Sequence, residues 1–439
     1  QSGDLFRYPK PIKESHRLVS YTPDGWPGTK RRKDQADVGI YWMSVDGRRE
    51  LLVNDAELPC QQPVPLVQRP RPQLRASQVD LAKDTGTYYM QDVHEGPGLA
   101  GVPRGTVKKL RVVALEFRAA GVGMNNSGGP GGGALISTPV SIGNGTWDVK
   151  RVLGEATVHE DGSTFFIAPA RTPVYFQAVD AKGRVVQTMR SWSTLQPGEN
   201  ASCVGCHEAK NGAPPSPGYA KTLALAAAPQ TLAPFHGPAR GFSFPKEVQP
   251  ILDRHCIGCH NDREAVLALA AGEGEPVLET PRTGTGEKAF SLLGDTVTDE
   301  RSKRKWSDAY LVLTEAKRDG RKGSGAFRGQ PDGRLVKWIS SQSVPTPLPP
   351  YSAGSTRSGL LDLLASGHAG VTLSAADMEK IASWIDLVVP FGGDYLEANA
   401  WSEREMEKYI RFADKRRRME ALDREAVRRV RAAAGAEGR

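Results

Sequence analysis

Alternating hydrophobic and polar positions run through the first 200 residues and predict a series of short β-strands. Such alternation places one row of side chains in a core and the other in solvent. The strongest patterns lie at 18–25, 38–47, 49–53, 106–117, 155–159, 163–167 and 174–178. Asp-Gly and Lys-Gly pairs between several of them are turn signals. The spacing of the later strands, roughly 8–12 residues, predicts a β-sandwich in the middle of the chain.

The first seventy residues resemble one blade of a TolB-like β-propeller. This resemblance rests on the Pro23-Asp24-Gly25 turn and on the strand and turn of 38–53. One blade cannot bury both of its faces, so we expect the chain to start inside a propeller whose earlier blades are missing. The proline-rich stretch 59–72 predicts an extended strap that ends this part.

Hydrophobic spacing changes to a helical period after residue 244. Residues 245–255 predict one helix, and 378–387 predict another that begins at Ser374, a typical N-cap residue. The stretch 270–355 is polar and predicts irregular structure with only short apolar segments. We interpret the Ala- and Pro-rich stretch 210–240 as a linker. The glycine-rich stretch 124–133 predicts a flexible loop, because no Gly-Lys-Ser/Thr follows it.

Composition excludes two broad classes. The chain has 439 residues, of which 39% are hydrophobic and 25% charged, so neither a membrane-embedded nor a disordered protein fits. No apolar stretch approaches the roughly 18 residues of a membrane span. The net charge is +8, and residues 401–439 hold 12 basic and 8 acidic residues. A solvated, charged C-terminal helix is favoured there over a nucleic-acid or membrane surface, because no aromatic residues are interleaved.

Two short motifs carry the chemistry. Four of the five cysteines lie in Cys203-Val204-Gly205-Cys206-His207 and Cys256-Ile257-Gly258-Cys259-His260. This spacing is typical of c-type haem attachment. The two thiols bind the two vinyl groups of one porphyrin, and the adjacent imidazole then reaches the iron. The sequence therefore predicts two covalently bound c-type haems, with His207 and His260 as iron ligands.

Three other interpretations of the motifs stay open. A single four-thiolate zinc site would need an unusually long separation, 49 residues between Cys206 and Cys256, and would not explain the two histidines. Zinc is therefore conceivable but unsupported. A thioredoxin-like redox pair lacks its βαβ pattern. Two disulfides would suit an exported protein.

The second axial ligands are less clear from sequence. For the second haem we favour His368, which follows a glycine just ahead of the helix that starts at Ser374. Met378 is the rival, although ordinary core packing explains it better. His255, next to Cys256, is interpreted as a surface residue. For the first haem, His94 and His159 are candidates, each more often a structural histidine. A five-coordinate first iron, open to substrate, is the alternative.

Several stretches together resemble the hydrazine synthase alpha subunit family of planctomycete-type bacteria. The middle-domain resemblance is carried by 104–112, 147–152, 160–170, 189–199 and 202–207. A following cytochrome c-like domain is indicated by 248–260 and 373–395. The resemblance implies a multidomain protein. An all-β N-terminal part, consisting of a terminal propeller blade and a β-sandwich-like middle domain, precedes a mainly α cytochrome c-like domain.

We divide the chain accordingly into five parts. These are 1–70, the partial propeller blade with its strap; 71–200, the β-sandwich-like middle domain; 201–240, the first haem motif with a linker; 241–400, the cytochrome c-like haem domain; and 401–439, the charged C-terminal helix.

The resemblance also bears on function. In the synthase the first haem is a catalytic centre with a tyrosine ligand shortly after the motif and a zinc ion nearby. Here residues 208–212 contain no tyrosine, and the next one is Tyr219. We therefore expect an exported, periplasmic dihaem protein that transfers electrons to redox partner proteins, within a multisubunit complex. A haem-dependent oxidoreductase acting on small nitrogen compounds and a binding module with auxiliary haems are the alternatives. Whether the protein is an enzyme stays open. Cys60, the fifth cysteine, is either an extra haem attachment or a free thiol.

Overall fold

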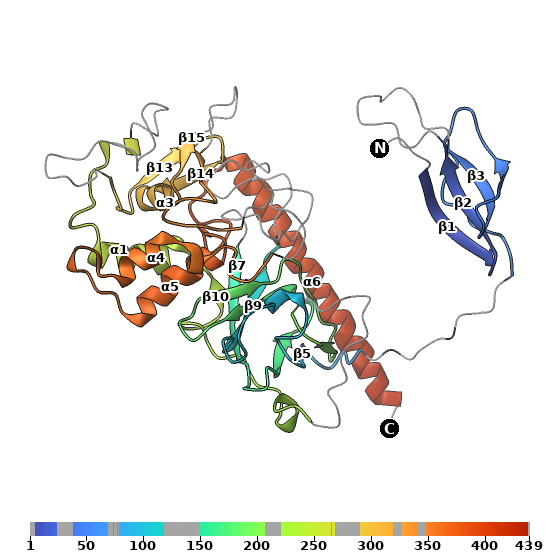
Figure 1. The fold of residues 1–439 in the computed structure, drawn as a ribbon, viewed down its shortest axis with the longest axis horizontal. Helices are drawn as coiled ribbons and strands as arrows, with labels where there is room; N and C mark the ends of the chain where they lie inside the picture. The colour runs from blue at the N-terminus through green and yellow to red at the C-terminus, as the bar shows by residue number, and fades with distance from the viewer. Residues whose placement is uncertain are drawn as a thin grey trace. The chain divides into compact units, whose positions relative to one another are not determined.

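The computed structural model divides the chain into two compact units, residues 1–77 and 78–439, which are described separately. Figure 1 shows their elements. The structure describes residues 5–23, 38–68, 73, 77, 79–117, 149–206, 221–264, 266–267, 290–318, 327–339 and 348–437. The glycine-rich stretch 124–133 and His207 lie outside these residues.

The first unit is a four-stranded antiparallel meander in the order β1-β2-β3-β4. Its strands are β1 (Leu5–Lys13), β2 (His16–Thr22), β3 (Gly39–Ser44) and β4 (Arg49–Val53). Val19, Tyr21 and Ile40 are buried, as the alternation requires, whereas all of β4 is exposed. The predicted blade-like sheet is therefore present, and the described residues do not form a closed propeller.

A β-sandwich forms one half of the second unit. One sheet has the order β10-β9-β6-β7-β12, and the other has the order β11-β5-β8. The strands of these two sheets are β5 (Thr85–Met90), β6 (Lys109–Leu115), β7 (Lys150–Thr157), β8 (Thr164–Pro169), β9 (Val174–Val179), β10 (Val185–Thr188), β11 (Asn200–Cys203) and β12 (Arg240–Gly241). The 3-10 turn η1 (Pro97–Leu99) lies between β5 and β6 in the chain. The strands predicted at 106–117, 155–159, 163–167 and 174–178 correspond to β6, β7, β8 and β9.

The core of the sandwich comes from the facing rows of the two sheets. Tyr88 and Phe166 of the smaller sheet pack with Val112, Ala178 and Val186 of the larger one. In β5 and β8 the burial alternates strictly, so their other faces point away from this core.

The described part of the expected linker, residues 221–240, runs along the sandwich instead. Gln230 exchanges backbone hydrogen bonds with β8, and Ala233 exchanges them with Glu155 of β7. Phe235 is buried, and the segment includes the 3-10 turn η3 (Ala224–Ala226) and leads into strand β12. Its alanines and prolines suit close backbone contact with a sheet edge, which composition alone does not distinguish from a free linker.

A mainly helical part forms the other half of this unit. It comprises η4 (Phe244–Val248), α1 (Gln249–His255), α3 (Asp308–Leu313), η6 (Ser355–Arg357), α4 (Gly359–Ala365), η7 (His368–Gly370) and α5 (Ala375–Asp386). Two strand pairs, β13 (Thr296–Asp299) with β14 (Arg304–Ser307) and β15 (Lys317–Arg318) with β16 (Phe327–Arg328), lie beside α3 in sequence.

The expectation of irregular structure over 270–355 was therefore wrong for its middle. Every residue of α3 is buried, and Trp306 and Tyr310 belong to the largest core cluster of the unit. The helix has only six residues and is surrounded by its neighbours. It consequently shows no amphipathic period, and sequence alone does not reveal it.

This second core cluster joins the two halves of the unit. It contains Val113 and Tyr175 of the sandwich together with Phe244, Trp384 and Ile385 of the helical part. The sandwich thus has a core on each side of its larger sheet, and α5 packs against the outer one.

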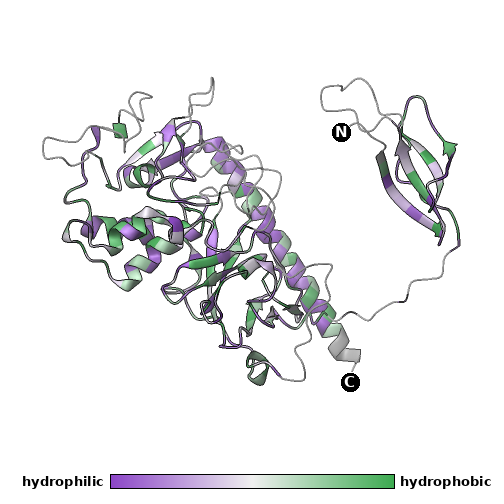
Figure 2. Cartoon of the chain, in the orientation of Figure 1, coloured by the Kyte–Doolittle hydropathy of each residue, from purple (hydrophilic) through white to green (hydrophobic). Residues whose placement is uncertain are grey.

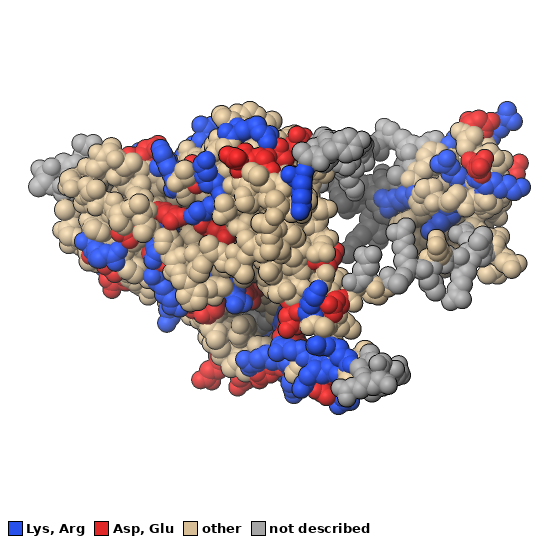
Figure 3. Space-filling model, turned by 90° about the horizontal axis from the view of Figure 1, so that it is seen from below, with Lys and Arg blue, Asp and Glu red and all other residues tan. Residues whose placement is uncertain are grey.

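The chain ends in the long helix α6 (Glu403–Glu437), close to the predicted helix at 401–439. Figure 2 shows it as mainly hydrophilic, with separate apolar positions. Intrahelical ion pairs such as Arg416–Glu420 and Arg429–Glu425 run along it. In Figure 3, Lys and Arg side chains gather at the lower edge of the view. Within the described residues, no helix has the length and apolar character needed to span a membrane.

Candidate functional site

The second Cys-x-x-Cys-His motif forms a tight turn at the end of α1. The Cys256 N–H donates to Leu252 O at 2.8 Å, and the His260 N–H donates back to Cys256 O at 3.0 Å. The turn therefore brings His260 next to the first cysteine. Cys256 is half-buried against the core, where burial raises the pKa of its thiol, and Cys259 is exposed. None of the five cysteines forms a disulfide.

His260 and His368 lie together, although 107 residues separate them in the chain. Their rings are nearly parallel, at 11°, with centroids 6.1 Å apart. Two imidazoles bound to one metal ion from opposite sides, with metal–nitrogen bonds of about 2 Å, have ring centres roughly 6 Å apart. Phe290 stacks on His260 at 4.3 Å. The arrangement thus suits a pair of imidazole ligands, beside two thiols and an aromatic ring.

Local structure explains how His368 reaches this place. Gly367, between α4 and η7, adopts a left-handed conformation with φ 79°, which favours glycine. The Val371 N–H then closes a turn on His368 O at 2.9 Å. Ser374 caps α5, as predicted, because its side-chain oxygen accepts a hydrogen bond from the Asp377 N–H. The Arg254–Asp377 ion pair, at 3.1 Å, ties the end of α1 to the start of α5.

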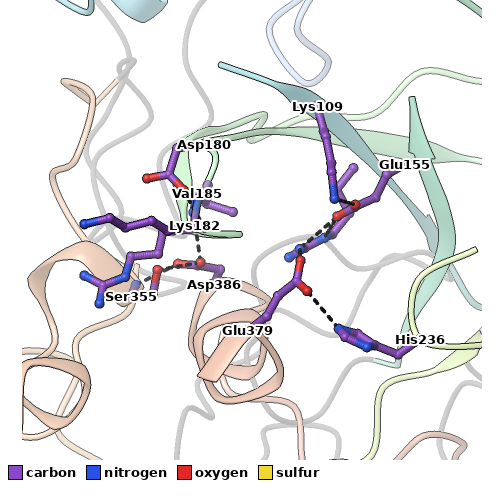
Figure 4. Close-up of polar contacts among 11 residues, drawn as sticks. Lys109, Glu155, Asp180, Lys182, Val185, His236, Ser355, Glu379 and Asp386 are labelled. Carbon is purple, nitrogen blue, oxygen red and sulfur yellow. Dashed lines mark hydrogen bonds and ion pairs between the residues drawn. The ribbon is translucent and has the colours of Figure 1, made fainter. Parts of the chain in front are cut away.

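Buried charges fasten α5 to the sandwich, as Figure 4 shows. Arg111 of β6, fully buried, pairs with Glu155 of β7 at 3.0 Å and faces Glu379 of α5 at 3.8 Å. Glu379 also contacts His236 Nε2 at 3.0 Å. Burial alone would raise the pKa of Glu155, but Arg111 and Lys109 outweigh it and hold that pKa below its usual value. The network is therefore a charged contact between sheet and helix.

A second anchor lies at the C-terminal end of α5. The buried carboxylate of Asp386 accepts hydrogen bonds from Ser355 N and Ser355 Oγ, both at 2.7 Å, and from Val185 N of β10 at 3.1 Å. Burial raises its pKa to about 6, against the lowering effect of these donors. The helix that follows His368 is thus held at both ends.

The first Cys-x-x-Cys segment leaves β11 and lies against the loop 91–98. Three backbone N–H groups of this loop, those of Gln91, Asp92 and Gly98, donate to the carbonyls of Cys203, Val204 and Cys206. The approach is close: a Cβ added at Gly98 would lie 2.6 Å from Cys206 O, and one at Gly205 would lie 2.2 Å from Glu95 O. The segment is consequently held along its whole length.

His94 belongs to the loop that holds the first motif. Its Nδ1 is buried and has no hydrogen-bond partner in the described part of the chain. Burial lowers the pKa of this imidazole, Asp92 opposes the effect, and Arg104 adds to it. His159 is half-buried in the neighbouring turn, where its N–H donates to Ser163 O. His207 cannot be placed beside them, since it lies outside the described residues.

The remaining predicted residues have simpler surroundings. Met378 is half-buried and packs against the core cluster, in agreement with ordinary packing. Cys60 lies in the first unit, where its N–H donates to Val38 O at 2.8 Å and its Sγ lies 3.9 Å from Leu58 O. No group of three or more His, Cys, Asp or Glu side chains in the described residues could hold a metal ion, so the four motif cysteines do not converge on one zinc site.

Sequence reasoning missed the residues around His260 that lie beyond its own motif. Phe290 is one, and the buried pair Ser291 and Asp308 with the half-buried Arg263 is another. No periodic pattern marks them. The only signal is an Asp inside the otherwise apolar stretch around α3, where a buried carboxylate requires a partner.

The fold and the two motifs define a class: a β-sandwich joined to a helical part, each carrying a Cys-x-x-Cys segment. Residues 105–208 match the family model "Hydrazine synthase alpha subunit middle domain". The chain is 25% identical over 248 residues to hydrazine synthase subunit alpha of Kuenenia stuttgartiensis, a match covering 47% of this chain and 28% of that one. The predicted resemblance to the hydrazine synthase alpha subunit family is confirmed by both matches.

A solved structure supports the same fold. The chain resembles Kuenenia stuttgartiensis hydrazine synthase with a TM-score of 0.54 at 18% identity, over 91% of this chain and 57% of the other. The chain therefore spans only part of the length of each of these relatives.

Proposed function

We propose that this protein is an exported electron-transfer protein that carries two covalently attached c-type haems. The observation that carries the proposal is the parallel pair of His260 and His368 rings beside the free thiols of Cys256 and Cys259. One side chain would supply each axial position of one iron, and the two thiols would hold the porphyrin.

The surroundings of this pair support a planar, apolar cofactor. Ile257 lies within the motif and Phe290 stacks on His260, and both are half-buried. Leu364, Leu373 and Met378, which are near His368 in sequence, are half-buried at the edge of the large core cluster. His368 and Cys259 are exposed. A porphyrin seated there would cover these side chains and remove apolar surface from water.

For the first haem, Cys203 and Cys206 are the proposed attachment points and His207 the proposed ligand. His94 is the proposed residue near its other face, since it is half-buried in the loop that holds the motif and its Nδ1 has no hydrogen-bond partner among the described residues. A neutral imidazole can bind iron or hold a proton near it. Cys60 remains a candidate for an additional attachment.

Haem content tests the proposal directly. The protein is expressed with a c-type haem maturation system and assayed as the pyridine haemochrome. We expect two haems per chain, one after Cys203→Ser with Cys206→Ser, and one after Cys256→Ser with Cys259→Ser. Cys60→Ser is the control that tests the fifth cysteine: unchanged content and an intact haem peptide map would exclude an additional attachment. A colourless protein that binds zinc would overturn the proposal.

The ligand assignment needs its own measurement. We expect His368→Ala to convert the second haem from low-spin to high-spin in electron paramagnetic resonance spectra, because one strong ligand is lost. Met378→Leu, a volume-conserving change, is the matched control and should leave the spectrum unchanged. If Met378→Leu alters the spectrum instead, the methionine is the ligand.

A haem-dependent oxidoreductase is the second candidate, and it is favoured if the half-buried His94 beside the first motif holds a proton near the iron instead of binding it. It predicts a high-spin first haem that binds small nitrogen ligands, whereas a carrier predicts two low-spin haems. The curated relative is named as a subunit, so a multisubunit complex with redox partners and a periplasmic location are part of the proposal.

A further inference from the structure

The side chain of Asp308 lies at the meeting point of two segments that flank His260. Asp308 is the first residue of α3, and its side chain is fully buried. It accepts hydrogen bonds from Arg263 Nε at 2.6 Å and Nη2 at 3.4 Å, and from Ser291 Oγ at 3.0 Å. Ser291 is itself fully buried. One carboxylate therefore binds Arg263 from the loop of the proposed ligand and Ser291 from the segment paired with that loop.

Both partners belong to segments next to His260. Arg263 follows it by three residues, in the same loop. Ser291 forms a β-bridge with Asn261, and the next residue, Leu292, donates its N–H to His260 O at 2.8 Å. Phe290, on the other side of Ser291, stacks on the imidazole. Movement of either segment would consequently displace the His260 ring.

The charges make this contact strong. A carboxylate buried as deeply as Asp308 needs a partner of opposite charge, and Arg263 supplies a two-bond contact. The same contact raises the pKa of Arg263. Arg263 also faces Asp295 at 3.6 Å. Loss of the Asp308 charge would leave Arg263 free to turn toward Asp295 and solvent.

We infer that Asp308 is a positioning residue that holds the His260 imidazole in the orientation required for binding the second iron, an inference that rests on the proposed haem at this motif. Groups that hold a metal ligand in place through contacts of this kind alter metal affinity by roughly 10–100-fold. Here the thioether bonds keep the haem attached, so the effect falls on the iron–imidazole bond and not on haem content.

Carbon monoxide binding to the reduced second haem measures that bond. The experiment uses the full chain with Cys203→Ser and Cys206→Ser, so that only the second haem is present. We expect Asp308→Asn to raise the fraction of haem that binds carbon monoxide by roughly tenfold or more, with haem content unchanged. Ser291→Ala removes one hydrogen bond to Asp308 and one from Leu293 N, but leaves the Arg263–Asp308 contact intact, so it should act in the same direction with smaller effect.

Asp299→Asn is the matched control. Asp299 is equally buried, and in the described part of the chain its carboxylate accepts hydrogen bonds from Arg301 N, Ser302 N, Trp306 Nε1 and Phe327 N, none of which belongs to the His260 segments. It should lower the melting temperature without changing carbon monoxide binding. The inference is overturned if Asp308→Asn and Ser291→Ala bind carbon monoxide no better than Asp299→Asn. If the parent protein attaches no haem at the second motif, the proposed function fails instead.

Discussion

Gly205 and Gly258 occupy the same place in the two Cys-x-x-Cys segments, but their surroundings differ. A Cβ at Gly205 would lie 2.2 Å from Glu95 O and 2.8 Å from Asp92 O, both backbone atoms. A Cβ at Gly258 would meet nothing within 4 Å. The first segment is therefore enclosed by a loop, whereas the middle of the second lies in open space.

Because of this difference, replacing the glycine by alanine should have an effect on stability in the first segment and none in the second. Gly205→Ala should destabilise the fold by about 1–3 kcal/mol, as overpacking does, and lower haem attachment at the first motif. Gly258→Ala should leave the free energy of unfolding unchanged, because no described protein atom lies within 4 Å of the added Cβ. Thermal unfolding and haem counting check the pair, and equal effects at the two positions would contradict the description of the loop.

Asp386 makes stability depend on pH. Its native pKa of about 6 exceeds the ordinary value of 3.8, so between these values the folded protein binds more protons than the unfolded chain. The contribution of Asp386 to stability is therefore largest below pH 4 and is lost as the pH rises to 6. Asp386→Asn removes this titration. The free-energy difference between parent and variant should change by up to about 3 kcal/mol across that window.

Denaturant unfolding at several pH values from 4 to 7 measures this difference. Comparing the variant with the parent cancels the titration of other groups, such as Glu155, whose lowered pKa acts in the opposite direction. A difference that stays constant with pH would show that Asp386 is ionised throughout.

At the scale of elements, α5 connects the sandwich to His368. Its middle is held by Glu379, its end by Asp386, and its start by the Ser374 cap and the Arg254–Asp377 pair. A rigid helix start next to η7 limits how far His368 can move from His260. The position of the His368 side chain thus depends on α5. Helix α5 is held in turn by sheet residues that lie more than 150 residues earlier in the chain.

Two helix caps test this dependence. Ser374→Ala should lower the free energy of unfolding by about 1 kcal/mol, the usual cost of losing an N-cap, and should broaden the low-spin signal of the second haem. Ser402 caps α6 in the same way, with its Oγ accepting from Glu405 N. Ser402→Ala should have a comparable cost in stability and leave the haem signal unchanged. A changed signal in both variants would indicate a general loosening of the fold.

At the scale of the whole molecule, both motifs belong to the second unit. Residues 78–439 have two hydrophobic cores of their own, and the sheet of residues 5–53 has its own pairing. Independent cores favour independent folding.

A protein consisting of residues 78–439 should therefore fold, melt in the same transition as the second unit of the full chain, and attach two haems. Calorimetry and the haemochrome assay check this. Loss of the first haem in the shorter protein would indicate that the first unit, including Cys60, contributes to that site.

Local patterns determined a good part of this protein. Strand alternation predicted β6 to β9, and the residue type of Ser374 predicted the cap of α5, since each depends on neighbours within a few residues. The spacing of Cys203–Cys206 and Cys256–Cys259 predicts haem attachment on the same local basis, and that stays a prediction. Only the tertiary structure decided the rest. The buried helix α3, the Arg111–Glu379 contact and the approach of His368, Phe290 and Asp308 to the His260 loop join residues that lie far apart in the chain. Packing of the two cores selects those contacts, and no local period records them.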